Sequence, residues 1–334
     1  MEIEKKTKVM LAKDGLTGLG DDVDLDYFKT VADKVLLEFS ENNRETFEID
    51  EEVTLNVTIK NVQKLSISIY EFNTETYYKK NLAPFDTSID LDGLLASEQQ
   101  NFEYDHSSNY RHTQEFKFPS LIGKIGLFIV EFVGNGVNAR AVVKKGRLSM
   151  VHRSTPAGHL CYIIDQNKDI CMGEKRTGVY FDSKFYEADK KNGRIFIPYA
   201  KSSQYSKIIM VHGDFAQLGD FERKTENYDF DAQIYLNSES VIVGSSTTIV
   251  IKPSLTINGR TADPKMLKNT KVTVKTSNYI DSVPITRNFD GLSFEKNGEC
   301  LIQFQVPPSL GSIKVDLKTQ VQNATTKKME DFSA

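Results

Sequence analysis

A strict two-residue alternation of apolar and polar side chains constrains this chain more than any other feature. Val53, Leu55, Val57 and Ile59 alternate with polar residues. In an extended strand this period places the apolar side chains on one face and the polar ones on the other. The pattern returns, with changes, at residues 65–69, 272–274, 302–306 and 313–317. Burial of one face only is typical of antiparallel sheets, so the pattern predicts an all-β chain built from antiparallel β-sandwiches.

The length and the turn signals predict several domains. A chain of 334 residues has room for two or three. Aspartates before an apolar i, i+4 pattern predict a short helix in the N-terminal segment. We expect that segment, a large sandwich, a small sandwich, a second large sandwich and a polar tail at residues 1–33, 34–148, 149–226, 227–325 and 326–334.

The two large sandwiches share an outline, which predicts an array of similar domains. Each is expected to open with a strand, a polar gap and a second strand. Each closes with a proline element, a Ser-Leu pair and a glycine, at residues 118–123 and 306–311. Self-similarity of this kind is the usual signature of repeated domains.

The composition limits the partners that this chain can have. Hydrophobic residues make up 39% and charged residues 26% of the chain, and the formal net charge is -4. Binding to nucleic acid needs a basic face, so we expect none. No apolar run approaches the roughly 20 residues that cross a bilayer, so we expect no membrane insertion by this segment. The location is left open: cytoplasmic if the chain is complete, extracellular or at the surface if it is a fragment.

The motifs that would indicate catalysis or a cofactor are weak. Residues 134–139 match the G-x-G-x-x-A form of a dinucleotide fingerprint, but no helix pattern follows to meet a pyrophosphate, so a hairpin is expected. The acidic stretch at 165–169 lacks the glycine and the glutamate of a calcium loop. The sequence therefore predicts no enzyme, no cofactor and no metal site.

The three cysteines favour thiols over a disulfide framework. A stapled secreted domain usually has a dense, even set, and this chain has Cys161, Cys171 and Cys300. One alternative remains open. If residues 165–167 form a three-residue hairpin loop, Cys161 lies opposite Cys171, near the reach of a cross-strand disulfide. A register shift of one residue would remove this pairing.

The first place to look for protein binding is the tyrosine-rich region of the first large sandwich. Tyr77, Tyr78, Tyr104 and Tyr110 could offer large contacts at low entropic cost, although packing on the sandwich rim explains them equally well. Binding is expected to use loops, because the inner sheet faces form the core. The sequence thus predicts a non-catalytic structural or protein-interaction segment of a larger multidomain protein, with protein partners of unknown identity. An adhesion or glycan-binding module is the alternative.

A family resemblance adds to this prediction. Residues 47–62, 65–73 and 126–132 resemble the macroglobulin domains of the alpha-macroglobulin family, and residues 162–165 and 192–198 are similar to the hairpins of its small sandwiches. The resemblance implies an array of macroglobulin or immunoglobulin-like sandwiches. It also implies, as a further alternative, a fragment of a protease inhibitor whose active elements lie elsewhere, since this sequence has neither the family's G-C-G-E-Q thioester nor a bait segment.

Overall fold

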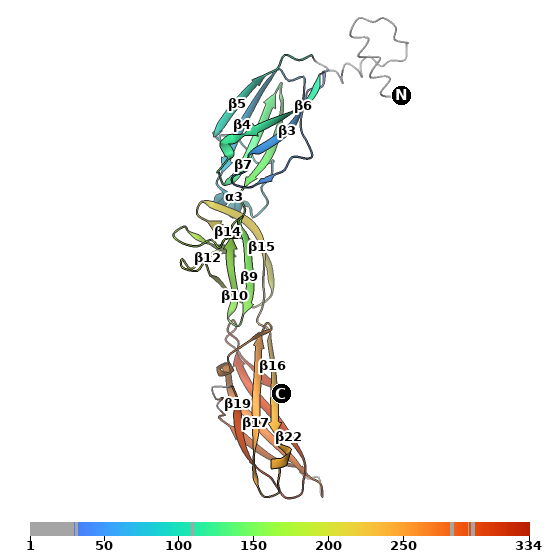
Figure 1. Cartoon of the computed structure of the whole chain (residues 1–334), viewed down its shortest axis with the longest axis vertical. Helices are drawn as coiled ribbons and strands as arrows, with labels where there is room; N and C mark the ends of the chain where they lie inside the picture. Colours follow the sequence, from blue (N-terminus) through green and yellow to red (C-terminus); the bar gives the residue numbers. More distant parts are fainter. Residues whose placement is uncertain (1–29, 31–32, 108–109, 281–283, 293, 295–297) are drawn as a thin grey trace, which may run out of the picture. The chain divides into compact units, whose positions relative to one another are not determined.

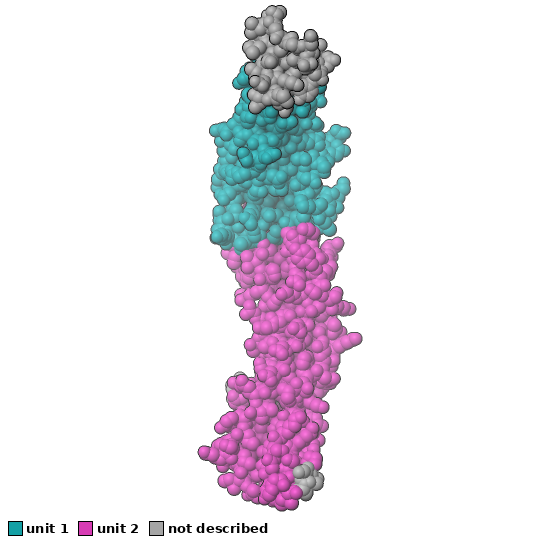
Figure 2. All heavy atoms as spheres, turned by 90° about the vertical axis from the view of Figure 1, so that its right-hand side faces the viewer, with its two compact units in different colours: residues 1–149, 164–169, 209–218 teal, residues 150–163, 170–208, 219–334 magenta. Residues whose placement is uncertain are grey.

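The computed structural model divides into two compact units. It describes residues 30, 33–107, 110–280, 284–292, 294 and 298–334. Unit 1 contains residues 1–149, 164–169 and 209–218, and unit 2 contains residues 150–163, 170–208 and 219–334 (Figure 2). The helix predicted in the N-terminal segment falls almost entirely outside the described residues.

Unit 1 contains an antiparallel β-sandwich. One sheet has the strand order β1-β3-β6 and the other β2-β8-β7-β4-β5 (Figure 1). The strands are β1 (Leu36–Phe39), β2 (Thr46–Phe47), β3 (Val53–Lys60), β4 (Lys64–Phe72), β5 (Glu98–Glu103), β6 (Arg111–Phe118), β7 (Gly126–Gly134) and β8 (Val137–Lys145). The helix α3 (Thr74–Asn81) follows β4, and a 3-10 turn, η1 (Pro119–Leu121), follows β6.

The alternation in the sequence is the alternation of burial in this sandwich. Val53, Leu55, Val57 and Ile59 of β3 are buried, and the residues between them are partly exposed. They pack against buried side chains of β4, β6 and β7 in one core cluster. Removing apolar area from water stabilises the sandwich by about 25 cal/mol per Å².

Two elements of unit 1 differ from the expectation. The polar region before β6 contains the strand β5, and the tyrosines Tyr77 and Tyr78 lie on the helix α3. Residues 91–94 form a hydrogen-bonded turn, in which the N–H of Leu94 donates to the oxygen of Leu91. The dinucleotide-like stretch is the expected β7–β8 hairpin, with Asn135 and Gly136 at φ values of 46° and 81°.

The middle of the chain forms two small sheets. Their strand orders are β13-β10-β9 and β12-β11-β14-β15. The strands are β9 (Ser149–Thr155), β10 (Gly158–Ile164), β11 (Thr177–Phe181), β12 (Lys184–Glu187), β13 (Ile195–Pro198), β14 (Gln204–His212) and β15 (Phe215–Arg223). Of these strands, β9, β12, β14 and β15 are not predicted from the sequence.

The C-terminal sandwich in unit 2 shares the topology of seven strands with the sandwich in unit 1, whereas β2 and β18 have no counterpart. One sheet has the order β16-β17-β18, with β21 also paired to β17, and the other has the order β20-β19-β22-β23. The strands are β16 (Tyr228–Leu236), β17 (Ser246–Ile257), β18 (Arg260–Thr261), β19 (Leu267–Asn278), β20 (Pro284–Asp290), β21 (Cys300–Gln305), β22 (Leu310–Gln322) and β23 (Met329–Ser333). The 3-10 turns are η2 (Ser238–Ser240) and η3 (Pro264–Met266). In chain order, β16-β17-β21 corresponds to β1-β3-β6, and β20-β19-β22-β23 to β5-β4-β7-β8. The internal similarity expected from residues 118–123 and 306–311 is thus a similarity of topology.

The polar tail is a strand. Residues 326–334 were expected to be a separate tail, but β23 pairs antiparallel with β22 along residues 318–322. The prediction failed because the segment carries little apolar alternation of its own, and its partner strand supplies the hydrogen bonds. The boundaries predicted at 148/149 and 226/227 stay a prediction. Each sheet of the described residues lies within residues 34–148, 149–226 or 227–334.

Candidate interaction surfaces

One end of the unit 1 sandwich is covered by two segments from further along the chain. The N–H of Ile49 donates to Gln166 Oε1 at 3.1 Å. The N–H of Ala216 donates to Thr74 Oγ1 at 2.7 Å, and the N–H of Leu148 donates to Gln217 Oε1 at 2.7 Å. Residues 164–169 and 209–218, both part of unit 1, therefore satisfy polar groups in the turn before β3 and at the start of α3.

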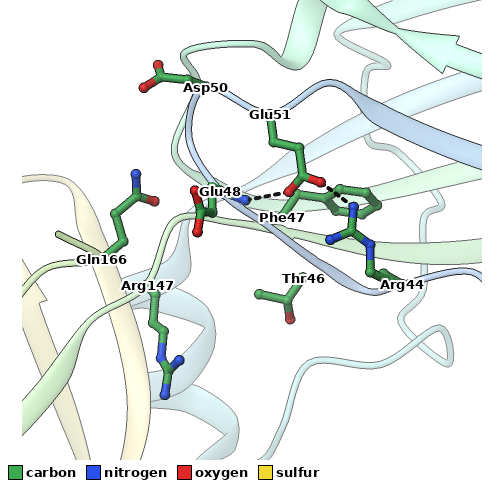
Figure 3. A pocket seen from close by; sticks show the side chains of 8 residues that line it. All are labelled: Arg44, Thr46, Phe47, Glu48, Asp50, Glu51, Arg147 and Gln166. Atoms are coloured by element: carbon green, nitrogen blue, oxygen red, sulfur yellow. Dashed lines mark hydrogen bonds and ion pairs between the residues drawn. The ribbon is translucent and has the colours of Figure 1, made fainter.

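A polar hollow of about 640 Å³ lies beside these contacts (Figure 3). Its centre is Glu51, which pairs with Arg44 and accepts a hydrogen bond from the N–H of Glu48 at 3.1 Å. The Arg44 guanidinium is the largest cause that lowers the pKa of Glu51. The buried ammonium of Lys145 donates to the backbone oxygen of Glu51, and burial lowers its pKa. Glu51 and Lys145 are thus both held by partners within this part of unit 1, Glu51 by Arg44 and the N–H of Glu48, and Lys145 by the backbone oxygen of Glu51.

Two of the four predicted tyrosines are packed rather than displayed. Tyr78 is buried, and burial raises its pKa to about 12. Tyr77 lies between Tyr78 and Phe85, at ring-centroid distances of 5.4 and 5.0 Å, and its hydroxyl donates to the oxygen of Pro84. Asn73 caps this helix by accepting a hydrogen bond from the N–H of Thr76. Both rings therefore help to hold α3 in place.

The other two tyrosines, Tyr104 and Tyr110, contact His106 and His112 near the end of β3 and the start of β6. Tyr104 is half-buried, and its hydroxyl donates to Gln114 Oε1 at 2.8 Å. Tyr110 is 49% exposed. Its ring lies 4.7 Å from His106 and 5.0 Å from His112. Tyr110 is thus the member of the predicted set that can offer contact area, and its role in binding stays a prediction.

The alternative alignment of Cys161 with Cys171 does not form, because the loop begins one residue later than that alignment requires. The N–H of Asp165 donates to the oxygen of Asp169, and the N–H of Cys171 donates to the oxygen of Ile163. The loop therefore consists of residues 166–168, and Cys171 faces Ile163, while Cys161 pairs with Ile195 of β13. Both cysteines are buried thiols. Burial raises the pKa of Cys161 to about 12, so this thiol stays protonated and unreactive at neutral pH.

The outer face of the β16-β17-β21 sheet carries an apolar row. Tyr235, Val250 and Leu301 are neighbours across the three strands. Tyr235 and Leu301 are exposed, whereas the next row on this face is polar and contains the Lys252–Glu299 ion pair. We call these three residues the apolar row.

A second exposed apolar group lies at one end of the same sandwich. It consists of Ile242 and Val243, in the loop before β17, and Tyr279 and Ile280, which follow β19. The N–H of Gly244 donates to Val306, and that of Tyr279 donates to Ser309, so both loops flank one segment at the ends of β21 and β22. We call these four residues the apolar tip.

Sequence reasoning missed both the apolar row and the apolar tip. The signal was present, since Ile242-Val243 and Tyr279-Ile280 are apolar pairs between turn residues and outside any alternating strand. In the part of the chain that the structure describes, no group of three or more His, Cys, Asp and Glu side chains could hold a metal ion. None of the described helices has the length and apolar character that crossing a membrane requires.

Comparison with known families defines the class of these domains. Residues 65–146 match the model of the AbpF first immunoglobulin-like domain, and residues 237–334 match that of the AbpF third immunoglobulin-like domain. The chain therefore carries immunoglobulin-like β-sandwiches, and the predicted fold class is confirmed. The polar residues 326–334 belong to the second match.

One relative and two solved structures illustrate the similarity. The chain is 30% identical over 297 residues to Actin-binding protein F of Dictyostelium discoideum, covering 87% of this chain and 12% of the relative. The chain thus spans about an eighth of that protein.

Among solved structures, a crystal structure of Escherichia coli alpha-2-macroglobulin spanning domains NIE-MG1 is 11% identical. It covers 57% of this chain and 98% of that one, with a TM-score of 0.36. A cryo-EM structure of the native E. coli protein is 12% identical and covers 90% of this chain and 20% of that one, with a TM-score of 0.31. These scores are too low to support any statement about this chain. The family models that match are those of immunoglobulin-like domains. The resemblance to the alpha-macroglobulin family therefore holds for the sandwich fold and not for the family itself.

Proposed function

We propose that this chain is a non-catalytic protein-interaction segment of a longer array of immunoglobulin-like domains, and that actin filaments are its partner. The observation that carries the proposal is the similarity to a relative named Actin-binding protein F, which extends over 87% of this chain. Because the similarity runs through the unit 1 sandwich and the C-terminal sandwich, the shared property is expected to reside in the domains themselves.

The geometry supports a binding role more than a catalytic one. The inner faces of the sheets are occupied by core residues, which leaves loops and outer faces for contacts. The hollow around Glu51 is built from paired charges, with the Glu51 carboxylate held by Arg44 and by the N–H of Glu48. A carboxylate with a lowered pKa and no proton to give is poorly suited to general acid catalysis.

The apolar row is the surface that we assign to the filament. Exposed aromatic and aliphatic residues on an otherwise polar face are common at protein interfaces, where a few such side chains contribute most of the binding energy. Tyr235 and Leu301 flank Val250 on adjacent strands, so a partner can contact all three at once.

Co-sedimentation with actin filaments tests this function. The purified chain is expected to pellet with filaments in a saturable manner. The double variant Tyr235→Ser/Leu301→Ser is expected to bind at least about fivefold more weakly, because truncating an interface anchor typically costs more than 1 kcal/mol. Both side chains are exposed, so the variant should melt like the parent.

A matched control variant tests whether the apolar row, and not just any exposed tyrosine, binds the filament. Tyr205→Ser removes a tyrosine that is also strongly exposed but lies on β14, and it should bind filaments like the parent. If the parent chain stays in the supernatant at every filament concentration, actin is not its partner. If parent and double variant bind equally, the filament uses another surface.

A further inference from the structure

The apolar tip exposes four large apolar side chains at one end of the C-terminal sandwich. Ile242 and Val243 are 64% and 61% exposed, and Tyr279 and Ile280 are 71% and 72% exposed. Ser240 and Ser245 lie in the loop before β17, and Ser309 lies in the segment between β21 and β22 that both loops flank. An apolar centre with a small polar rim is the usual anatomy of a protein–protein interface.

The corresponding end of the unit 1 sandwich is covered. By topology, β3 corresponds to β17 and β4 to β19. The loop that leads into β3 contains Ile49, and the residues after β4 include Thr74. The N–H of Ile49 donates to Gln166, and Thr74 accepts from the N–H of Ala216, as described above.

The segments that make these contacts belong to hairpins of the middle sheets. Residues 164–169 form the hydrogen-bonded turn after β10, and residues 209–218 are the tip of the β14–β15 hairpin. Within unit 1, one hairpin loop therefore contacts the turn before β3, and the other contacts the start of α3.

The register supports the comparison between the two ends. Val53 pairs with Phe118 at the start of β3, just before the Pro119–Leu121 turn. At the start of β17, Ser246 pairs with Gln305, and the N–H of Val306 donates to Ser245 just before the two prolines at 307–308. The loop of Ile49 bonds to Gly123 and the loop of Gly244 bonds to Val306, so both loops lie against the segment that follows the third strand of their sheet.

We propose that the apolar tip is a docking site for two hairpin loops of another immunoglobulin-like β-sandwich domain. One loop would cover Ile242 and Val243, and the other would cover Tyr279 and Ile280. Because these four positions are apolar, the docking loops are expected to contribute apolar side chains, in contrast to the amide and hydroxyl contacts of unit 1. The proposal rests on the array part of the proposed function and is independent of actin binding.

Hydroxyl-radical labelling of tyrosine tests this site in the protein as it occurs. The polypeptide that contains this chain would be purified from its native source with an antibody and labelled without actin, beside the recombinant chain. Tyr279 should be labelled at least about fivefold less in the native polypeptide, because docking removes its ring from water. Tyr205 is also 71% exposed, and it should be labelled equally in both samples.

Lysine cross-linking identifies what covers the tip. Lys314 lies on β22 a few residues from the tip and is mostly exposed, so it should cross-link to a hairpin loop of another sandwich. Equal labelling of Tyr279 in the two samples would overturn the proposal. Protection of Tyr279 that appears only when filaments are added would also overturn it, and would make the tip part of the actin interface. A failure of co-sedimentation leaves these readouts unaffected, so the two proposals can fail separately.

Discussion

At the residue scale, the most unusual group is the buried histidine of the middle sheets. His159 on β10 is almost fully buried and contacts the rings of Tyr199 and Phe221 at 4.9 and 5.2 Å. Its Nε2 accepts the N–H of Lys224 at 3.1 Å, so Nδ1 carries the proton, and Nδ1 has no hydrogen-bond partner among the described residues. Burial, with a smaller effect of His152, lowers the pKa of His159 to about 4.

The lowered pKa makes stability depend on pH in a defined direction. Between about pH 6.5 and pH 4 the histidine is protonated in the unfolded chain, where its pKa is near 6.5, but neutral in the folded chain. The free energy of unfolding therefore decreases as the pH falls through this range. The difference corresponds to about 3 kcal/mol at most. Urea unfolding at pH 7 and pH 4.5 should show this loss.

The variant His159→Gln separates this effect from other titrating groups. Glutamine keeps an acceptor for the N–H of Lys224 but takes up no proton. The variant is expected to be less stable at pH 7, because its packing is poorer, but to lose less stability than the parent between pH 7 and pH 4.5. Parallel pH profiles for parent and variant would show that His159 is not responsible.

At the scale of single elements, β23 shows how a polar segment becomes part of a sandwich. Its backbone pairs with β22 from Lys318↔Ser333 to Gln322↔Met329. Its aromatic side chain, Phe332, lies 6.0 Å from Tyr228 and 6.1 Å from Phe230, measured between ring centroids. The strand therefore closes one edge of the sheet and covers part of a small core.

Deleting residues 326–334 should destabilise the C-terminal sandwich. The loss of the Phe332 contacts amounts to about 2 kcal/mol, which lowers the melting temperature of a domain of this size by at least about 5 °C. The substitution Phe332→Ala should reproduce most of the effect. Met329→Ser, which changes an exposed side chain of the same strand, should leave the melting temperature within about 1 °C. A truncated chain that melts like the parent would mean that the segment adds nothing to the fold.

At the scale of the whole molecule, the described residues have separate hydrophobic cores. One cluster belongs to the unit 1 sandwich and contains Leu55, Ile69 and Phe132. Another belongs to the C-terminal sandwich and contains Ile251, Val274 and Phe304. Domains with their own cores can unfold independently, so unfolding of the chain is expected to proceed in more than one transition.

The substitution Ile69→Asp should abolish the transition of unit 1 and leave that of the C-terminal sandwich. Ile69 is buried between Glu98 and Val130, and a carboxylate there would cost about 4 kcal/mol or more. Calorimetry of parent and variant measures both transitions. The control Thr54→Asp places a carboxylate on the outer side of β3, opposite Lys117, and should be close to neutral. Loss of both transitions in Ile69→Asp would mean that the chain unfolds as a single cooperative unit.

The residue pattern alone predicts which strands have a buried face and how the sharpest turns fold. Val53, Leu55, Val57 and Ile59 are buried as their alternation predicts, and residues 134–136 form a hairpin because asparagine and glycine tolerate positive φ. These properties are local, since they depend on the period of side chains along a strand and on the conformations open to single residues.

Tertiary structure alone decided which strands pair, in which register, and which ends are covered. The polar strands β5 and β23 exist because β4 and β22 offer them hydrogen-bonding partners. The loop at Asp165–Asp169 begins one residue later than the cysteine alignment requires, so Cys171 faces Ile163 and not Cys161, a difference that no side-chain period encodes. The same holds for the candidate surfaces. The loops of Ile242 and Tyr279 lie at the same end of the C-terminal sandwich because both bond to residues 306–309, and their distance in sequence gives no sign of it.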